Sequence, residues 1–114
     1  MFKGLGGLGD MSRMMKAAQE MQGKIAELQE SFDSIEVAGE SGAGLVRATC
    51  SAKGELRALD IDPSIFDPSQ KEVVEDLIVA AIKDAQKKAA DRAQSEMKRL
   101  YESLGLPADM KLPF

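Results

Sequence analysis

The chain reverses direction within Val37-Ala38-Gly39-Glu40-Ser41-Gly42-Ala43-Gly44-Leu45-Val46, where three glycines separate two apolar runs. Glycine adopts positive φ without steric cost, so the cluster predicts a hairpin connection of several residues between two strands. A phosphate-binding loop is the alternative. Such loops lead from a strand into a helix and end in Lys followed by Ser or Thr. Here a second strand follows and Glu40 would repel phosphate, which favours the turn.

Three short strands are predicted around this turn. Ile35 and Val37 alternate with polar residues before it, and apolar and polar residues alternate over residues 46–52 after it. Lys53-Gly54 then reverses the chain again, and a third strand covers residues 55–62. Short strands joined by short turns predict a three-stranded antiparallel meander.

A long helix is predicted before the strands, over about residues 11–32. Its apolar residues recur at alternating spacings of three and four, the heptad pattern of a coiled-coil seam. Methionine in such a seam indicates a core stripe or, alternatively, an adaptable partner surface. Residues 1–10 are rich in glycine and are expected to be a flexible N-terminus. The seam consists of Met11, Met14, Ala18, Met21, Ile25, Leu28 and Phe32.

A second long helix is predicted after the strands. Asp67 is its expected N-cap, with Pro68 in the first helical position and Glu72 completing a capping box. Gly105 marks the end of this helix. About 36 residues at about 1.5 Å each give it a length of about 54 Å. A compact domain of 100 residues has a radius of gyration of only about 13 Å. Both helices are therefore expected to project beyond the sheet from a single domain over residues 11–105, followed by a tail over residues 106–114.

Composition excludes most enzyme classes. The 114 residues contain no His and one Cys, so common general bases and cysteine zinc sites are missing. The segment Gly4-Leu5-Gly6-Gly7-Leu8-Gly9 matches a dinucleotide-binding pattern formally, but no strand precedes it. No apolar run approaches the ~20 residues that span a bilayer. We therefore expect a cytoplasmic protein with no catalytic residues, metal, cofactor, small-molecule substrate or membrane association.

Charge is unevenly distributed along the chain. The net charge is −4, yet Lys83 to Arg99 holds six cations against three acidic residues. Like-charged pairs four residues apart are mildly destabilising on a free helix, which suggests an anionic partner. The alternative is a solvated helix face, because Asp84/Lys88, Lys87/Asp91 and Arg92/Glu96 have the spacing of ordinary ion pairs.

Several segments together resemble the YbaB/EbfC family of bacterial nucleoid-associated proteins, over essentially the whole chain. They are Met11 to Met21 with Gln19 and Gln22, Val37 to Val46, Ile61-Asp62-Pro63-Ser64, Glu75-Asp76-Leu77-Ile78-Val79-Ala80-Ala81 and Lys111-Leu112-Pro113-Phe114.

The resemblance implies an α-β-β-β-α protomer of class α+β, a homodimer formed through the strands, and projecting helical arms. It also implies binding to double-stranded DNA with limited sequence specificity, in nucleoid organisation or gene regulation. The basic helix residues are carried over as DNA contacts: Arg13, Lys16, Lys24, Lys83, Lys87, Lys88 and Arg92.

A second hypothesis assigns the same arms to another role. In it, the chain is a protein-interaction module that uses the methionine-rich seam and binds no nucleic acid. The two hypotheses differ in whether random duplex DNA binds at low salt.

Overall fold

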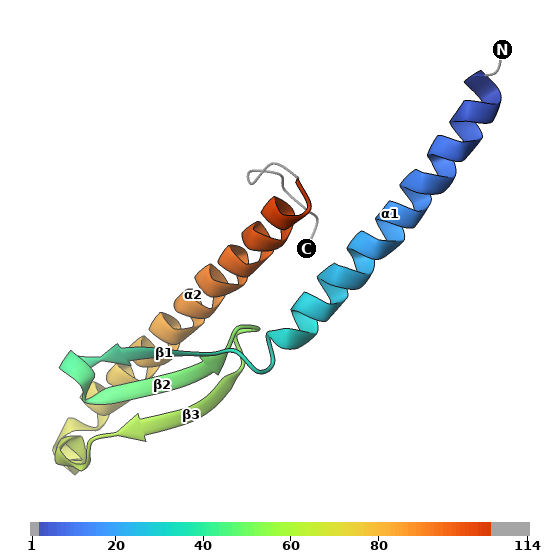
Figure 1. Cartoon of the computed structure of the whole chain (residues 1–114). Helices are drawn as coiled ribbons and strands as arrows, with labels where there is room; N and C mark the ends of the chain where they lie inside the picture. The colour runs from blue at the N-terminus through green and yellow to red at the C-terminus, as the bar shows by residue number, and fades with distance from the viewer. Residues whose placement is uncertain (1–2, 106–114) are drawn as a thin grey trace.

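The computed structural model describes residues 3–105, which form two long helices around a three-stranded sheet (Figure 1). This order confirms the predicted α-β-β-β-α protomer and its α+β class. The elements, with η for a short 3-10 turn, are α1 (Lys3–Ser31), β1 (Glu36–Ser41), η1 (Gly42–Gly44), β2 (Val46–Ser51), β3 (Leu56–Ile61), η2 (Pro63–Ile65), η3 (Pro68–Gln70) and α2 (Lys71–Ser103).

The sheet is the predicted antiparallel meander with strand order β1-β2-β3. Gly39 pairs with Ala48, and Ala48 pairs with Leu59 on the other side. Because residues directly opposite one another share a face, these three lie on the same side of the sheet. Both β1 and β3 are edge strands of this sheet.

The glycine turn is left-handed. Gly42, Ala43 and Gly44 all have positive φ, at 59°, 56° and 91°. Consecutive residues of this kind turn the chain tightly in the sense that suits the twist of a hairpin. The prediction of a turn is therefore confirmed, and Ala43 occupies a conformation that costs an L-residue about 1–2 kcal/mol.

Helix α2 packs on one face of the sheet through alanine. Ala81, Ala85 and Ala89 are fully buried, together with Val46, Ala48 and Cys50 of β2. Small side chains allow the helix to approach the strands closely. The Ser41 hydroxyl also donates a hydrogen bond to the carbonyl of Leu77. Cys50 is thus a buried packing residue.

Helix α1 is attached to the rest of the chain near its C-terminal end. Phe32 is buried among Ala52, Met97 and Tyr101, which form a second small core. The Lys53 ammonium lies 3.1 Å from Oδ2 of Asp33, and the Arg57 guanidinium lies 3.5 Å from Oδ1 of the same carboxylate. The turn after β2 is therefore tied to the end of α1.

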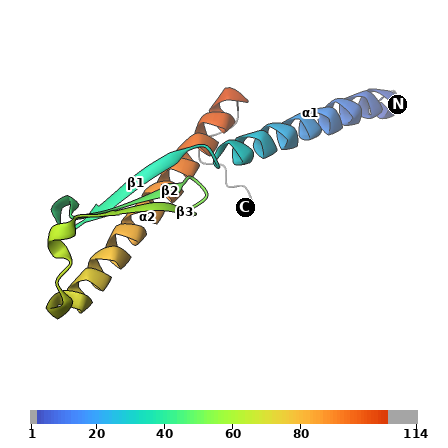
Figure 2. The ribbon, with the colours of Figure 1, turned by 90° about the horizontal axis from the view of Figure 1, so that it is seen from below.

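Both helices extend beyond the same end of the sheet and diverge there (Figures 1 and 2). The principal extents are 82 × 22 × 19 Å and the radius of gyration is 21.7 Å. These values confirm the projecting helices predicted from helix length. Within residues 3–105, no helix combines the length and apolarity needed to cross a bilayer.

Two helix starts differ from the predictions. Helix α1 begins at Lys3, not near Met11, so the glycine-rich segment from residue 3 to residue 10 is helical. Each glycine costs about 1 kcal/mol relative to alanine but permits helical φ and ψ, so an established helix propagates through it. Asp67 caps η3 by accepting from the Ser69 amide at 3.0 Å, and α2 begins at Lys71 without a side-chain cap. The proposed tail, residues 106–114, lies outside the described residues.

Candidate nucleic-acid interface

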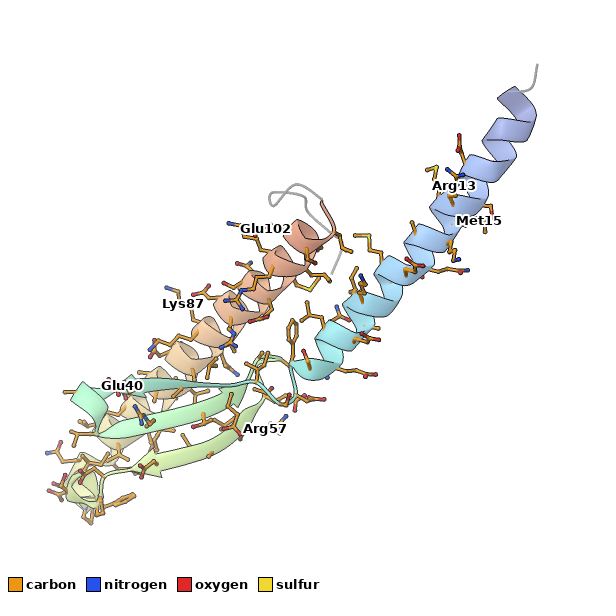
Figure 3. The ribbon with its side chains drawn as sticks, viewed as in Figure 1. Arg13, Met15, Glu40, Arg57, Lys87 and Glu102 are labelled. Carbon is orange, nitrogen blue, oxygen red and sulfur yellow. The ribbon has the colours of Figure 1, made fainter. Side chains whose placement is uncertain are left out.

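The predicted contacts on α2 are all exposed and occupy its middle third. Lys83, Lys87, Lys88 and Arg92 span ten residues, about 14 Å along the helix axis. Figure 3 shows Lys87 pointing into solvent from the side of α2 that faces away from the sheet. These four cations form a compact group, but they do not all have the same surroundings.

Lys88 and Arg92 are held in ion pairs. The Lys88 ammonium lies 3.0 Å from Oδ2 of Asp84, and Nε of Arg92 lies 3.0 Å from Oε1 of Glu96. Arg99 contacts the same Glu96 oxygen at 3.5 Å. Two of the predicted i, i+4 pairs are therefore confirmed, and these cations share their charge with a neighbouring carboxylate.

Asp84 links this helix face to the sheet. Its Oδ2 accepts a hydrogen bond from the backbone amide of Glu40 at 3.0 Å, in addition to the Lys88 contact. The Glu40 amide bond, followed by the hydrogen bond from Lys88, lowers the pKa of the Asp84 carboxyl. Because a charge-assisted bond favours the ionised carboxylate, Asp84 stays charged and keeps Lys88 engaged.

Lys83 and Lys87 differ from Lys88 and Arg92, which are held in ion pairs. Each lies two residues from Ala85, which places it about 160° around the helix from the alanine stripe. Neither takes part in an ion pair within residues 3–105, so the predicted Lys87–Asp91 pair is not formed there. Lys98 is not among the predicted contacts. It is also exposed and takes part in no ion pair within residues 3–105.

The predicted contacts on α1 form a separate group. Arg13, Lys16 and Lys24 are exposed, and their spacing places them on one flank of the helix. Glu20 and Glu27 occupy the same flank and dilute its charge. Figure 3 places Arg13 towards the free end of α1, far from Lys87. A single chain therefore does not bring the two basic groups together.

The sheet face that α2 leaves uncovered offers a poorer surface for an anion. Glu40 pairs with Arg47, and Arg47 pairs with Asp60, across its three strands. The Arg47 guanidinium lies 3.9 Å from the Glu40 carboxylate. Acidic groups thus outnumber the cation in this row, and helix α2 is the more basic surface.

Residues 7–104 match the YbaB/EbfC DNA-binding family, which accounts for nearly the whole described chain.

The chain belongs to the YbaB/EbfC DNA-binding family.

Two curated relatives of this chain are named nucleoid-associated proteins. One from Granulibacter bethesdensis is 47% identical over 105 residues, covering 92% of this chain and 98% of the relative. Another from Agrobacterium fabrum is 46% identical with the same coverage. An uncharacterized protein from Helicobacter pylori, known from its crystal structure, superimposes with a TM-score of 0.62 at 24% identity. That likeness covers 82% of this chain and 94% of the other, and it confirms the fold.

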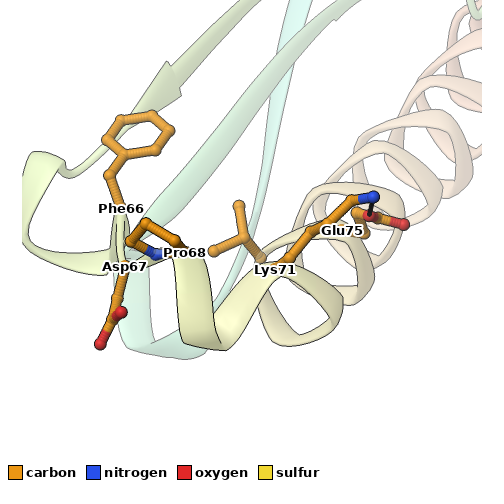
Figure 4. Close-up of a pocket in the computed structure, with 6 residues that line it drawn as sticks. Phe66, Asp67, Pro68, Lys71 and Glu75 are labelled. Atoms are coloured by element: carbon orange, nitrogen blue, oxygen red, sulfur yellow. Dashed lines mark ion pairs between the residues drawn. The ribbon is translucent and has the colours of Figure 1, made fainter.

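A groove in this YbaB/EbfC chain lies where η3 meets α2, and it has about 430 Å³ of free volume (Figure 4). Phe66, Pro68 and Val74 supply apolar walls, while Lys71 and Glu75 pair at 3.8 Å on its rim. The groove is open and almost entirely apolar, and its two paired charges are highly exposed. Asp67 also lines the groove.

Proposed function

We propose that the chain is a nucleoid-associated protein that binds duplex DNA as a homodimer, mainly through phosphate contacts and with low sequence specificity. The observation that carries this proposal is the pair Lys83 and Lys87, exposed on the outer side of a projecting helix and outside every ion pair of the described residues. The family supplies DNA as the partner. The names of the curated relatives support a place in the nucleoid.

Phosphate contact fits the chemistry of these residues. Lysine is a flexible point charge, well suited to an oxygen of the DNA backbone and poorly suited to discriminating one base from another. Aromatic residues make up only 4% of the sequence, so stacking on bases contributes little. The net charge of −4 means that binding depends on the local basic surface rather than on the charge of the whole molecule.

The homodimer is supported by apolar surface that one copy leaves open. Leu56 and Leu59 of β3 are 43% and 41% exposed. Leu59 lies on the α2 side of the sheet, but α2 covers β1 and β2 and leaves β3 open. A second copy placed against this edge would bury both leucines and pair an open strand. It would also give the assembly two sets of basic helices.

A salt titration tests the proposal. Fluorescence anisotropy with random-sequence duplex DNA is measured across a series of salt concentrations, starting at low salt. If about six phosphates are neutralised per dimer, log K falls with log salt at a slope of about −5. Absence of binding at low salt, or a flat salt response, overturns the proposal and favours the protein-interaction hypothesis.

A further inference from the structure

The middle of α1 carries an apolar stripe that the described residues leave uncovered. We define the methionine stripe as Met14, Ala17, Ala18 and Met21. Met14 is 70% exposed, and Ala17 and Ala18 are exposed as well. Seven residues separate Met14 from Met21, so at about 100° per residue the two point within about 20° of each other.

The C-terminal end of the stripe lies at a small cavity where α2 ends. This cavity, of about 220 Å³, is lined by Ala17, Glu20, Met21, Lys24 and Leu104. Leu104 is the residue that follows α2, and its amide still bonds to the carbonyls of Leu100 and Tyr101. The end of α2 therefore faces α1 across this cavity, at the C-terminal end of the methionine stripe.

The chain leaves α2 at this cavity. Gly105 follows Leu104 with φ of +76°, a left-handed value that terminates a helix. The described chain therefore ends beside the cavity that Met21 lines. Nine extended residues reach at most about 30 Å, whereas Met14 is only about 10 Å from Met21 along the axis of α1. The whole stripe is within reach of this segment.

The composition of residues 106–114 suits an apolar helix surface. The segment reads Leu-Pro-Ala-Asp-Met-Lys-Leu-Pro-Phe, with four large apolar side chains and two prolines. Proline has no amide proton to donate and disfavours a continued helix, so the segment favours an extended path. Leu106, Met110, Leu112 and Phe114 are spaced at intervals of four, two and two, and those at even spacing share one side of an extended chain.

We propose that residues 106–114 fold back along α1 of the same chain and cover the methionine stripe. This docking site is independent of DNA binding. Its occupant is the neighbouring segment because the segment starts at the cavity, is long enough and is apolar. The tail of a second copy is the competing occupant, and the mixed sample below detects it. A stripe that no tail covers, and that stays open to a different protein, is the third outcome.

Paramagnetic relaxation in the full chain tests the proposal. Cys50→Ala removes the native thiol, and Lys111→Cys provides a position for a nitroxide label between two apolar tail residues. The methionine methyl groups are labelled with ¹³C and assigned by single Met→Leu substitutions. We expect the Met14 and Met21 methyl signals to lose intensity. Met15 points about 120° away from Met21 and is 62% exposed, so its methyl signal should lose less intensity than those of Met14 and Met21.

A mixed sample separates the occupants. It contains nitroxide-labelled protein without ¹³C and ¹³C-methionine protein without nitroxide, left together long enough for subunits to exchange. Loss of Met14 and Met21 intensity in the doubly labelled protein but not in the mixture supports the proposal. Equal loss in the mixture shows that the tail of a second copy binds and overturns it. Loss in neither sample also overturns it, and thermal melting of each variant establishes that it is folded.

Discussion

Gly39 of β1 lies against Ala85 of α2 so closely that a Cβ at position 39 would sit 2.1 Å from the Ala85 amide nitrogen. The obstacle is backbone, since the next nearest atoms are Cα of Ala85 and the carbonyl carbon of Asp84. No rotamer change relieves such a contact. Gly39 was predicted as part of the turn, but it lies within β1 and provides close helix–strand approach instead.

We expect Gly39→Ala to destabilise the fold by about 1–3 kcal/mol or more, because the helix must move off the sheet to admit the methyl group. For a domain of this size each kcal/mol lowers Tm by about 4–8 °C. Gly23→Ala is the matched control. Position 23 of α1 has open space around it, so alanine there should stabilise by about 0.5–1 kcal/mol. Equal melting temperatures for the two variants would contradict this interpretation.

Ala43→Gly tests the left-handed turn. Ala43 has φ of 56°, where alanine pays a steric penalty that glycine avoids. The glycine variant should therefore be more stable by up to about 1 kcal/mol, despite the greater freedom of glycine in the unfolded chain. Urea denaturation measures the change. Ala58→Gly in β3 is the control and should lose stability, since glycine weakens a strand.

Leu59→Arg should convert the proposed homodimer to a monomer. The substitution places a charge on the apolar side of β3, which a second copy is proposed to cover. Sedimentation velocity at micromolar concentration would then show half the wild-type mass. Ala58→Arg lies on the same strand but on the opposite face and should leave the dimer intact. A wild-type protein that sediments as a monomer refutes the dimer directly.

Two double variants of α2 should affect DNA binding differently. Lys83→Gln with Lys87→Gln removes cations outside the observed ion pairs, whereas Lys88→Gln with Arg92→Gln removes cations engaged by Asp84 and Glu96. Each double variant loses two positive charges per chain. If each of the first two neutralises one phosphate, the salt slope becomes shallower by about 3.6 per dimer. The second variant should retain a steeper slope, and identical slopes would show that the ion pairs do not matter.

Stability should fall in acid partly through Asp84. Its pKa is lowered in the folded chain by the Glu40 amide and then by Lys88. A lowered folded pKa stabilises the protein above the unfolded value of about 3.9 and loses that effect as pH falls through the folded value. Asp84→Asn should therefore flatten the dependence of unfolding free energy on pH below about pH 4. Asp91→Asn, an exposed substitution on the same helix, should retain the wild-type slope there.

Periodicity predicted the elements well because it reflects burial directly. The alternation over residues 46–52 identified β2. The start of α1 was missed because glycine is a weak local signal that an adjoining helix overrides. The role of Gly39 was missed because sequence does not reveal that Ala85 would lie opposite it.

The candidate interface was only partly predictable, because sequence spacing reports contacts within one helix and not contacts between distant segments. Spacing identified the Asp84–Lys88 and Arg92–Glu96 pairs, which are local on the helix. It predicted Lys87–Asp91 equally well, although that pair is not formed. The link from Asp84 to the Glu40 amide joins residues 44 positions apart, and only the folded chain brings them together.

The buried contacts of α1 lie near its C-terminal end, around Phe32, where the Asp33 carboxylate also pairs with Lys53 and Arg57. From Ile25 to Lys3 the helix is about 33 Å long. A rotation of this segment by about 5° about Ile25 therefore displaces the N-terminal end of α1 by about 3 Å, roughly the length of one hydrogen bond. The position of Arg13 in space is thus sensitive to the angle at which α1 leaves Phe32, about twenty residues away.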